Sequence, residues 1–234
     1  MTVPLRPEPH RISWVGVVVP AHNEQELLPA CIIGLKAAAA VVRVPVSVIV
    51  VLDSCTDASQ AAVGPLPHIS VNALNVGKAR RLGFAHLLAE RPPGITDSQT
   101  WLATTDADSV VPSDWLSRML GHAAAGWSAV VGTVRVTDWS DHPEGVRTRW
   151  HAQYESGDRH AQVHGANLGV RADAYRRVGG MPSLSRAEDV ELVAALRAAG
   201  ERAFPAGDLP VVTSGRRTGR AAGGFAAHLQ ELAS

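Results

Sequence analysis

The sequence predicts a single α/β domain in which helices flank a mostly parallel sheet. Two observations lead there: apolar, β-branched runs alternate with amphipathic helical runs, and three of the apolar runs stop at polar residues. The chain has 234 residues, 46% of them hydrophobic, which is enough for one full core. Because parallel strands bring their carboxyl ends to one edge, the polar residues that follow them are expected to converge there.

The first half of the chain supplies four expected strands. They cover residues 12–19, 46–52, 69–71 and a run from Trp101 that stops at Asp106. A helix is expected after the first strand, because Asn23 and Glu26 have the spacing of a capping box and an apolar stripe follows. Another helix is expected after Asn75. This order of elements predicts right-handed crossovers and a parallel arrangement.

The second half continues with a helix over 113–126 and a strand over 129–136. The segment 138–164 is polar and aromatic, a composition that suits either a surface that meets a second substrate or a half-exposed helix. Glu188 and Asp189 open a further helix that extends to Gly200. Acidic residues in a first turn also complement the helix dipole, so helix capping is an alternative role for this pair.

Composition and charge exclude several classes of protein. The chain has 22 basic and 22 acidic residues, and no long basic run, so nucleic-acid binding is not expected. The two cysteines, Cys31 and Cys55, suit a reduced protein better than a disulfide framework. The hydrophobic stretch 30–52 is interrupted by charged residues and a proline, and the first residues lack a signal-peptide core. We therefore expect a cytoplasmic protein, with peripheral association at the inner face of a membrane as a further option.

The run 101–108 is the most informative motif, because an apolar strand ends in Asp106-Ala107-Asp108. Paired carboxylates at the carboxyl end of a strand supply the hard oxygen ligands that Mg²⁺ or Mn²⁺ uses together with substrate phosphates. The motif thus predicts a divalent cation that carries phosphates. Turn and helix-cap chemistry is the alternative, since Ser109 and Pro112-Ser113 follow.

Six short segments, taken in order, resemble the family 2 glycosyltransferases with the GT-A fold, a Rossmann-like architecture. The likeness runs from Val15 to about Ser214. The segments are Val17 to Glu24, Asp53 to Asp57, Asn75 to Ala79, Asp106 to Asp108, Gly165 to Arg171 with Gly179-Gly180-Met181, and Glu188-Asp189.

The resemblance implies an enzyme that moves a sugar, with a hexose as the expected case, from a nucleoside-diphosphate sugar to an acceptor hydroxyl. It implies metal dependence on Mg²⁺ or Mn²⁺ and inversion at the anomeric carbon. The Gln-x-x-Arg-Trp signature of processive synthases is absent, so single additions are expected. Residues 12–136 then form the nucleotide-sugar-binding half of one domain over 1–234, residues 137–214 the acceptor-side half, and residues 215–234 a basic flexible tail and a C-terminal helix.

The resemblance also assigns roles to single residues. Asp108 is expected to bind the metal, and Asp189 to act as the catalytic base with Glu188 as its positioning partner. The expected nucleotide-sugar-binding residues are Pro20, His22, Asn23, Glu24, Asp53, Lys78, Asp106, Arg216 and Arg217. The basic segment 213–220 is expected to close over the diphosphate, with a solvated tail as the alternative. His228 is left out of the site, because a lone histidine in a terminal helix is more often a surface or packing residue.

Other functions remain as alternatives. A non-catalytic sugar-nucleotide-binding protein has the same pocket, although it is expected to lose one of Asp108, Glu188 or Asp189, and all three are present. A sugar-phosphate nucleotidyltransferase would need a Gly-rich signature with Arg and Lys after the first strand, and an oxidoreductase would need Gly-x-Gly-x-x-Gly there. Neither pattern occurs. The acceptor stays open among a saccharide, a lipid-linked molecule and a small molecule.

Overall fold

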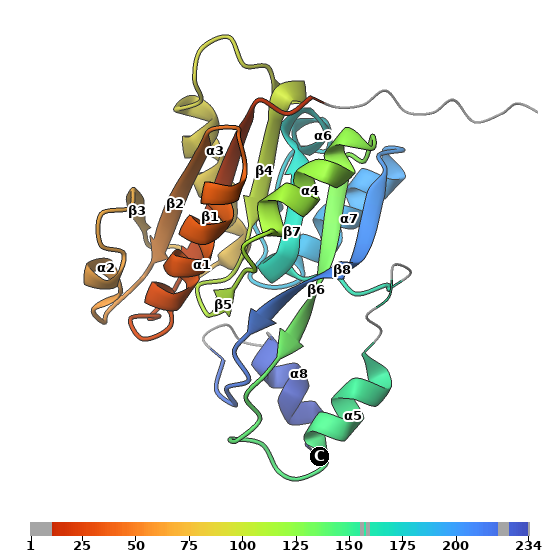
Figure 1. The fold of residues 1–234 in the computed structure, drawn as a ribbon. Coiled ribbons are helices and arrows are strands. Elements are labelled where there is room, and N and C mark those ends of the chain that lie inside the picture. The colour runs from red at the N-terminus through yellow and green to blue at the C-terminus, as the bar shows by residue number, and fades with distance from the viewer. Residues whose placement is uncertain (1–10, 155–156, 158–159, 220–224, 234) are drawn as a thin grey trace, which may run out of the picture.

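The computed structural model describes residues 11–154, 157, 160–219 and 225–233. Eight strands form one sheet in the order β3-β2-β1-β4-β7-β6-β8-β5, and helices cover both faces (Figure 1). This arrangement confirms the predicted α/β class.

The first half of the sheet is parallel. Its strands are β1 (Trp14–Ala21), β2 (Val46–Asp53), β3 (His68–Val71) and β4 (Thr100–Thr104), and their helices are α1 (Leu28–Val41), α2 (Ser59–Ala62), α3 (Val76–Ala89) and the short 3-10 turn η1 (Asp97–Gln99). β1 lies between β2 and β4, with Val18 beside Ile49 on one side and Thr104 on the other. The carboxyl ends of β1, β2 and β4 therefore share one edge, as predicted.

The second half adds antiparallel pairings. Its elements are β5 (Ser109–Val110), α4 (Trp115–Ala124), β6 (Ala129–Val136), α5 (Val146–Gln153), η2 (Gly165–Asn167), β7 (Leu168–Arg171), α6 (Ala172–Arg177), α7 (Glu188–Ala198), β8 (Ala203–Thr213) and α8 (Phe225–Glu231). β7 pairs antiparallel with both β4 and β6, and β5 pairs antiparallel with β8. Only β6 and β8 run parallel here, across an irregularity between Gly132 and Thr133.

Three hydrophobic clusters hold these elements together. One packs α1 and α4 against one face of the sheet around Trp101 and Trp115, and another packs α3, α6 and α7 against the other face around Trp14. A third, smaller cluster joins α5 and α8 to the end of β6 through Trp150 and Leu229. Figure 1 shows α5 and α8 as a small lobe beside the main body of the sheet. From this lobe, α8 lines the cavity described below.

The predicted capping box at Asn23 is wrong. α1 begins at Leu28, its N-terminal residue Leu27 offers no side-chain cap, and a proline occupies its first turn. Asn23 has a φ of 55°, and its side-chain oxygen accepts a hydrogen bond from the backbone N–H of Thr56 at 2.7 Å. A short polar residue tolerates this left-handed conformation, and its side chain then ties two loops together instead of starting a helix. Asn75, in contrast, does cap α3 through Lys78 N at 2.8 Å.

Neither cysteine forms a disulfide. Cys31 is buried on the apolar face of α1, and Cys55 is half-buried in the loop after β2. Burial raises the pKa of the Cys31 thiol, so that group stays protonated at neutral pH. Among the described residues, no helix combines the length and apolar character needed to cross a membrane.

Candidate active site

A cavity of about 560 Å³ opens at the carboxyl ends of β1, β2 and β4. Both halves of the chain line it, including the start of α3, the turn η2, the start of α7, the end of β8 and α8. The predicted site residues that line it are Pro20, His22, Glu24, Asp53, Asp106, Asp108, Glu188, Asp189 and Arg216. Residues separated by almost 200 positions in sequence thus meet in one space of a size typical of ligand sites.

Three predicted residues are not among those that line the cavity. Asn23 is engaged with the loop after β2, as described above. Lys78 is exposed on the first turn of α3, and Arg217 is exposed after β8, with its carbonyl oxygen accepting a hydrogen bond from Gln230 at 2.6 Å. Arg220, at the end of the basic segment, lies outside the described residues.

The Asp53 carboxylate organises the loop that leads into α3. It accepts backbone hydrogen bonds from Ala73 at 2.7 Å, Leu74 at 2.9 Å and Asn75 at 2.9 Å. Burial raises the pKa of Asp53, but these hydrogen bonds outweigh it and hold the pKa below its usual value. The carbonyl oxygen of Asp53 accepts a 2.6 Å hydrogen bond from Nδ1 of His22. Asp53 therefore fixes the shape of this cavity wall as a charged group.

Arg80 lines the cavity and is absent from the residues that the sequence analysis identifies. Its guanidinium forms ion pairs with Asp106 and with Glu188, and its Nε donates to Thr104 Oγ1 at 3.2 Å. The side chains of Arg80 and Glu188 are 3% and 5% exposed, so the pair has almost no contact with water. The sequence does contain a signal for this buried arginine. Arg80 lies three residues after Gly77 and three before Gly83, on the buried stripe of α3. A charge at such a position requires a buried partner.

Glycine is required where α3 meets the loop before α7. A Cβ on Gly77 would overlap the carbonyl oxygens of Pro182 and Leu184, and the Gly77 N–H donates to Leu184 O at 2.9 Å. This contact sets the start of α7 against α3. It thereby places Glu188 opposite Arg80.

Arg216 links the tail to the acidic edge of the sheet. Its guanidinium donates to both carboxylate oxygens of Glu24, at 2.8 and 2.5 Å, and lies 2.8 Å from Asp108 Oδ2. Burial and then the nearby Asp106 raise the pKa of Asp108 to about 7, while Arg216 opposes that shift. The carboxylates thus outnumber the cation here, so this edge favours additional positive charge.

The cavity edge fits a divalent cation through the chemistry of its donors. Asp108 offers a carboxylate in an acidic surrounding, and Mg²⁺ or Mn²⁺ is commonly held by one or two carboxylates together with substrate phosphates. No group of three or more His, Cys, Asp or Glu side chains within the described ranges is placed to hold an ion.

Asp189, at the start of α7, also lines the cavity. Its Oδ2 accepts a hydrogen bond from Gly165 N at 2.5 Å, and its Oδ1 accepts one from Val190 N at 2.8 Å. Burial raises the pKa of Glu188, its neighbour, whereas the Arg80 charge lowers it. His164, Phe225 and His228 line the cavity as well, so His228, which the sequence analysis leaves out of the site, does line it.

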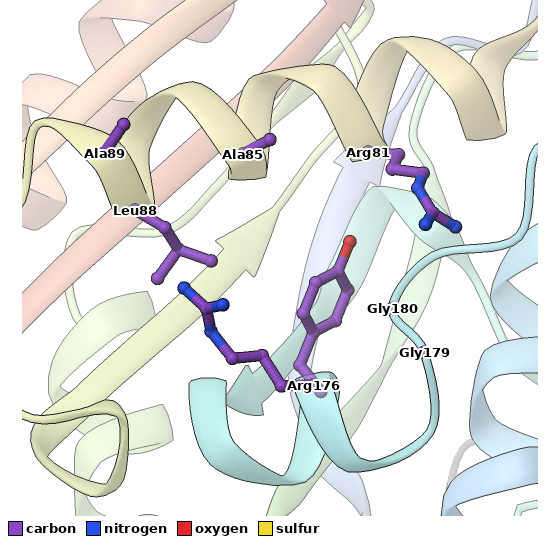
Figure 2. Close-up of a pocket in the computed structure, with 8 residues that line it drawn as sticks. Arg81, Ala85, Leu88, Ala89, Arg176, Gly179 and Gly180 are labelled. Carbon is purple, nitrogen blue, oxygen red and sulfur yellow. The ribbon is translucent and has the colours of Figure 1, made fainter.

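A second cavity, of about 480 Å³, lies between α3 and α6 (Figure 2). Figure 2 shows Arg81 and Arg176 on either side of a tyrosine ring, with Leu88 farther along α3 from Arg81. Each guanidinium already has an oxygen partner: Arg81 donates to Met181 O at 3.3 Å, and Arg176 lies 2.9 Å from Asp97. None of the predicted site residues lines this cavity.

Comparison with known proteins gives a consistent result. Residues 16–178 match the model of glycosyl transferase family 2. An undecaprenyl-phosphate 4-deoxy-4-formamido-L-arabinose transferase of Pectobacterium carotovorum is 35% identical over 130 residues, and one of Yersinia enterocolitica is 33% identical over 137 residues. These matches cover 53% and 55% of the chain but only 37% and 38% of the relatives.

Solved structures show the same fold. TarS (residues 1–349) of S. aureus in complex with UDP-GlcNAc has a TM-score of 0.64 at 14% identity, covering 93% of this chain and 64% of that one. The mannosyltransferase PcManGT of Pyrobaculum calidifontis in complex with GDP-Man and Mn²⁺ has a TM-score of 0.63 at 21% identity, covering 94% of this chain and 62% of that one. The fold is therefore that of GT-A glycosyltransferases.

Proposed function

The chain belongs to glycosyl transferase family 2, and on that premise we propose that its cavity transfers a sugar from a nucleoside-diphosphate sugar to an acceptor. The carrying observation is that the cavity joins two carboxylate sites from different halves of the chain. Asp106 and Asp108 follow β4 at the edge of the parallel strands, and Asp189 lies at the start of α7. A transfer reaction needs this division, because donor and acceptor must meet in a fixed geometry.

The donor lies along the edge formed by β1, β2 and β4. Pro20, His22 and the loop that Asp53 orders form the wall for the base and ribose, and Asp106 binds the ribose or the donor sugar. Arg216 binds the diphosphate, for which it exchanges part of its pairing with Glu24 and Asp108. A planar guanidinium suits this task because it binds phosphate oxygens in pairs.

A divalent cation is the proposed cofactor, held by Asp108. When bound, it supplies charge neutralisation for the departing diphosphate. Two observations support this proposal: the acidic surrounding of Asp108, and the Mn²⁺ present with GDP-Man in the structural relative from Pyrobaculum calidifontis.

Asp108→Ala is expected to abolish turnover and to leave the fold intact. The fold survives because Arg216 keeps its two hydrogen bonds with Glu24. The measurement is a Mn²⁺ titration of activity alongside thermal melting of both proteins. Asp114→Ala, at an exposed carboxylate before α4, is the control and keeps the wild-type metal response. Full activity of Asp108→Ala in EDTA would falsify the metal proposal.

Arg216→Ala is expected to raise the KM for the donor about tenfold to a hundredfold, the range for a lost charged hydrogen bond. The kcat changes less, because the residue binds the diphosphate in the ground state as well. Arg43→Ala, at an exposed arginine before β2, is the matched control for the loss of one positive charge. Unchanged donor kinetics in Arg216→Ala would contradict diphosphate binding by Arg216 and favour the alternative, in which the segment after β8 is a solvated tail.

The acceptor lies beside Asp189. For a hydroxyl acceptor, Asp189 takes the proton as the oxygen attacks the anomeric carbon from the face opposite the leaving diphosphate, and the configuration inverts. Glu188, held by Arg80, keeps the start of α7 in place. Single additions are proposed, without processive polymerisation.

The names of the relatives, which are undecaprenyl-phosphate sugar transferases, support one class of acceptor. We therefore place a lipid-linked phosphate or hydroxyl first among acceptors, with peripheral association at the inner face of a membrane. A phosphate acceptor is already ionised near neutral pH, so it needs no general base. The two classes of acceptor are thus separable by their dependence on Asp189.

The deciding experiment is a panel of UDP, GDP, CDP and dTDP sugars, with and without Mn²⁺. A true donor raises the melting temperature in a metal-dependent way, since a ligand that binds only the native state stabilises it. Transfer is then assayed with undecaprenyl phosphate and with alkyl glycosides. Stabilisation with no release of nucleoside diphosphate on any acceptor favours the alternative of a non-catalytic sugar-nucleotide-binding protein.

A further inference from the structure

The hydrogen bonds around Tyr154 determine where His164 carries its proton. The Tyr154 hydroxyl oxygen accepts a 2.8 Å hydrogen bond from the backbone N–H of Val134, and it lies 3.0 Å from Nε2 of His164. A backbone N–H can only donate, so the hydroxyl proton of Tyr154 remains available for His164. If Nε2 donated instead, that proton would have no acceptor among the described residues. The arrangement that satisfies every group leaves Nε2 as an acceptor and places the imidazole proton on Nδ1.

The surroundings fix both side chains. Tyr154 stacks on Trp150 with ring centroids 4.2 Å apart, and His164 stacks on Tyr154 at 5.8 Å. Phe225 from α8 meets the imidazole edge-on at 6.2 Å. The backbone is fixed as well, because the His164 carbonyl accepts a hydrogen bond from Asn167 N at 2.9 Å. These contacts hold the plane of the imidazole, and the hydrogen bond with Tyr154 is what selects its tautomer.

Both groups are neutral at physiological pH. Burial raises the pKa of Tyr154 to about 12 and lowers the pKa of His164 to about 4. The neighbouring His160 and His228 lower the His164 pKa further, whereas Asp106 opposes them. A neutral imidazole with Nε2 engaged presents one remaining polar atom, the Nδ1–H donor.

Among the described residues, the Nδ1–H of His164 has no hydrogen-bond partner. Nδ1 is also not one of the fully buried polar atoms that lack a partner, so it is accessible to a ligand. His164 lines the active-site cavity, and the next residue, Gly165, holds the Asp189 carboxylate through its N–H. The donor therefore belongs to a residue that lines the cavity and is adjacent in sequence to the glycine that holds Asp189.

We propose that His164 is a specificity-determining residue whose Nδ1–H donates a hydrogen bond to an oxygen of the acceptor, with Tyr154 as the positioning residue that fixes this tautomer. The proposal rests on the proposed function for the identity of the ligand as an acceptor. It names an oxygen ligand, from either a sugar hydroxyl or a lipid-linked phosphate.

A neutral donor is well matched to this place. A protonated imidazole near Asp189 would stabilise the carboxylate's charged form and weaken it as a base. A neutral N–H orients an acceptor oxygen with no such effect. It also discriminates against ligands that present a donor or an apolar group there, because the N–H would then lose its partner.

The first experiment reads the tautomer directly. Long-range ¹H–¹⁵N correlation on the histidine-labelled full chain is expected to show His164 with its proton on Nδ1. Tyr154→Phe keeps the ring stacking but removes the hydroxyl, so a mixture of tautomers is expected. Tyr175→Phe, at a buried tyrosine on α6, is the matched control and leaves the His164 signal unchanged. No turnover is needed, so this result stands apart from the success or failure of the transfer assay.

The second experiment titrates two probes in the presence of Mg²⁺ and whichever nucleoside diphosphate raises the melting temperature. Octyl β-glucoside offers hydroxyl oxygens, and citronellyl phosphate offers phosphate oxygens. The probe that shifts the Nδ1–H resonance identifies the oxygen source. His164→Gln, whose amide reaches toward the Nε2 position, is expected to weaken binding of that probe about threefold to tenfold, the value of one neutral hydrogen bond. His164→Asn, whose amide lies near the Nδ1 position, is expected to restore most of it.

Two results overturn the proposal. One is a wild-type spectrum with the His164 proton on Nε2. The other is an Nδ1–H resonance that neither probe moves, since an acceptor-facing donor must respond to an oxygen ligand.

Discussion

Arg80→Met is expected to lower the free energy of unfolding by about 3–5 kcal/mol, the range for removing one partner of a buried ion pair. The change leaves Glu188 buried without a cation and Asp106 without its ion-pair partner. Methionine fills much of the space but cannot donate hydrogen bonds, so the carboxylates would have to recruit water or move apart. Because Glu188 begins α7, movement there displaces the helix that carries Asp189.

Urea unfolding measures this loss. Arg81→Met is the matched control, because Arg81 is the next residue on α3, is exposed, and within the described part of the chain donates only to Met181 O, at 3.3 Å. A change within about 0.5 kcal/mol is therefore expected. Arg80→Lys keeps the positive charge but loses the forked N–H donors of the guanidinium, so an intermediate loss of unfolding free energy is expected. A loss below about 1 kcal/mol in Arg80→Met would contradict a stabilising role for the buried cluster.

The pH dependence of the Arg80→Met variant has a definite sign. In the wild type, burial raises the pKa of Glu188 and Arg80 opposes that shift, so without Arg80 the pKa of the folded state rises further above its unfolded value. The folded variant then binds more protons than the unfolded chain, and its stability increases as the pH falls toward the unfolded pKa. The stability difference between variant and wild type should therefore shrink between neutral and mildly acidic pH.

The sequence predicted the parts of the site that follow local rules. Asp53, Asp106 and Asp108 were identified because each follows an apolar strand, and parallel pairing alone then brings such residues together. The cap at Asn23 failed because the same polar side chain that starts a helix can also bridge two loops, and the partner, Thr56, lies 33 positions away. Local pattern does not distinguish these two uses.

Local sequence patterns do not predict which distant segments come into contact. The antiparallel direction of β7 depends on its two neighbours, β4 and β6, and not on any residue type within its four positions. The pairing of Arg216 with Glu24 joins residues 192 positions apart, which no periodicity indicates. The position of His228 in a terminal helix predicts a surface or packing role. In the structure, α8 packs against Trp150 and brings His228 to the cavity.

Asp189 makes more contacts than helix capping, its alternative role, would require. Asp189 does bond the first turn of α7 through Val190 N, but its other oxygen holds Gly165 N on a different segment. Asparagine has only one acceptor oxygen, so Asp189→Asn would turn an N–H group toward one of these two backbone donors. We therefore expect a stability cost of about 1–3 kcal/mol from the variant, which is more than a simple cap exchange.

Asp189→Asn is also expected to reduce the rate of transfer to a hydroxyl acceptor about a hundredfold or more, the usual scale for a lost general base. The assay is run well below the melting temperature of the variant, so that the stability cost does not contribute. Glu191→Gln, at an exposed acidic residue in the same first turn of α7, is the control and keeps the wild-type rate. A hydroxyl-transfer rate within about threefold of wild type would contradict the role of Asp189 as base.

The choice of acceptor makes the same variant more informative. An ionised phosphate attacks without losing a proton, so its rate in Asp189→Asn should fall much less than the hydroxyl rate. NMR of the product supplies the stereochemical test, because direct displacement at the anomeric carbon inverts its configuration for either acceptor. Retention would exclude direct displacement. It would instead indicate a two-step reaction, in which a nucleophile on the enzyme attacks the sugar first and the acceptor oxygen attacks second.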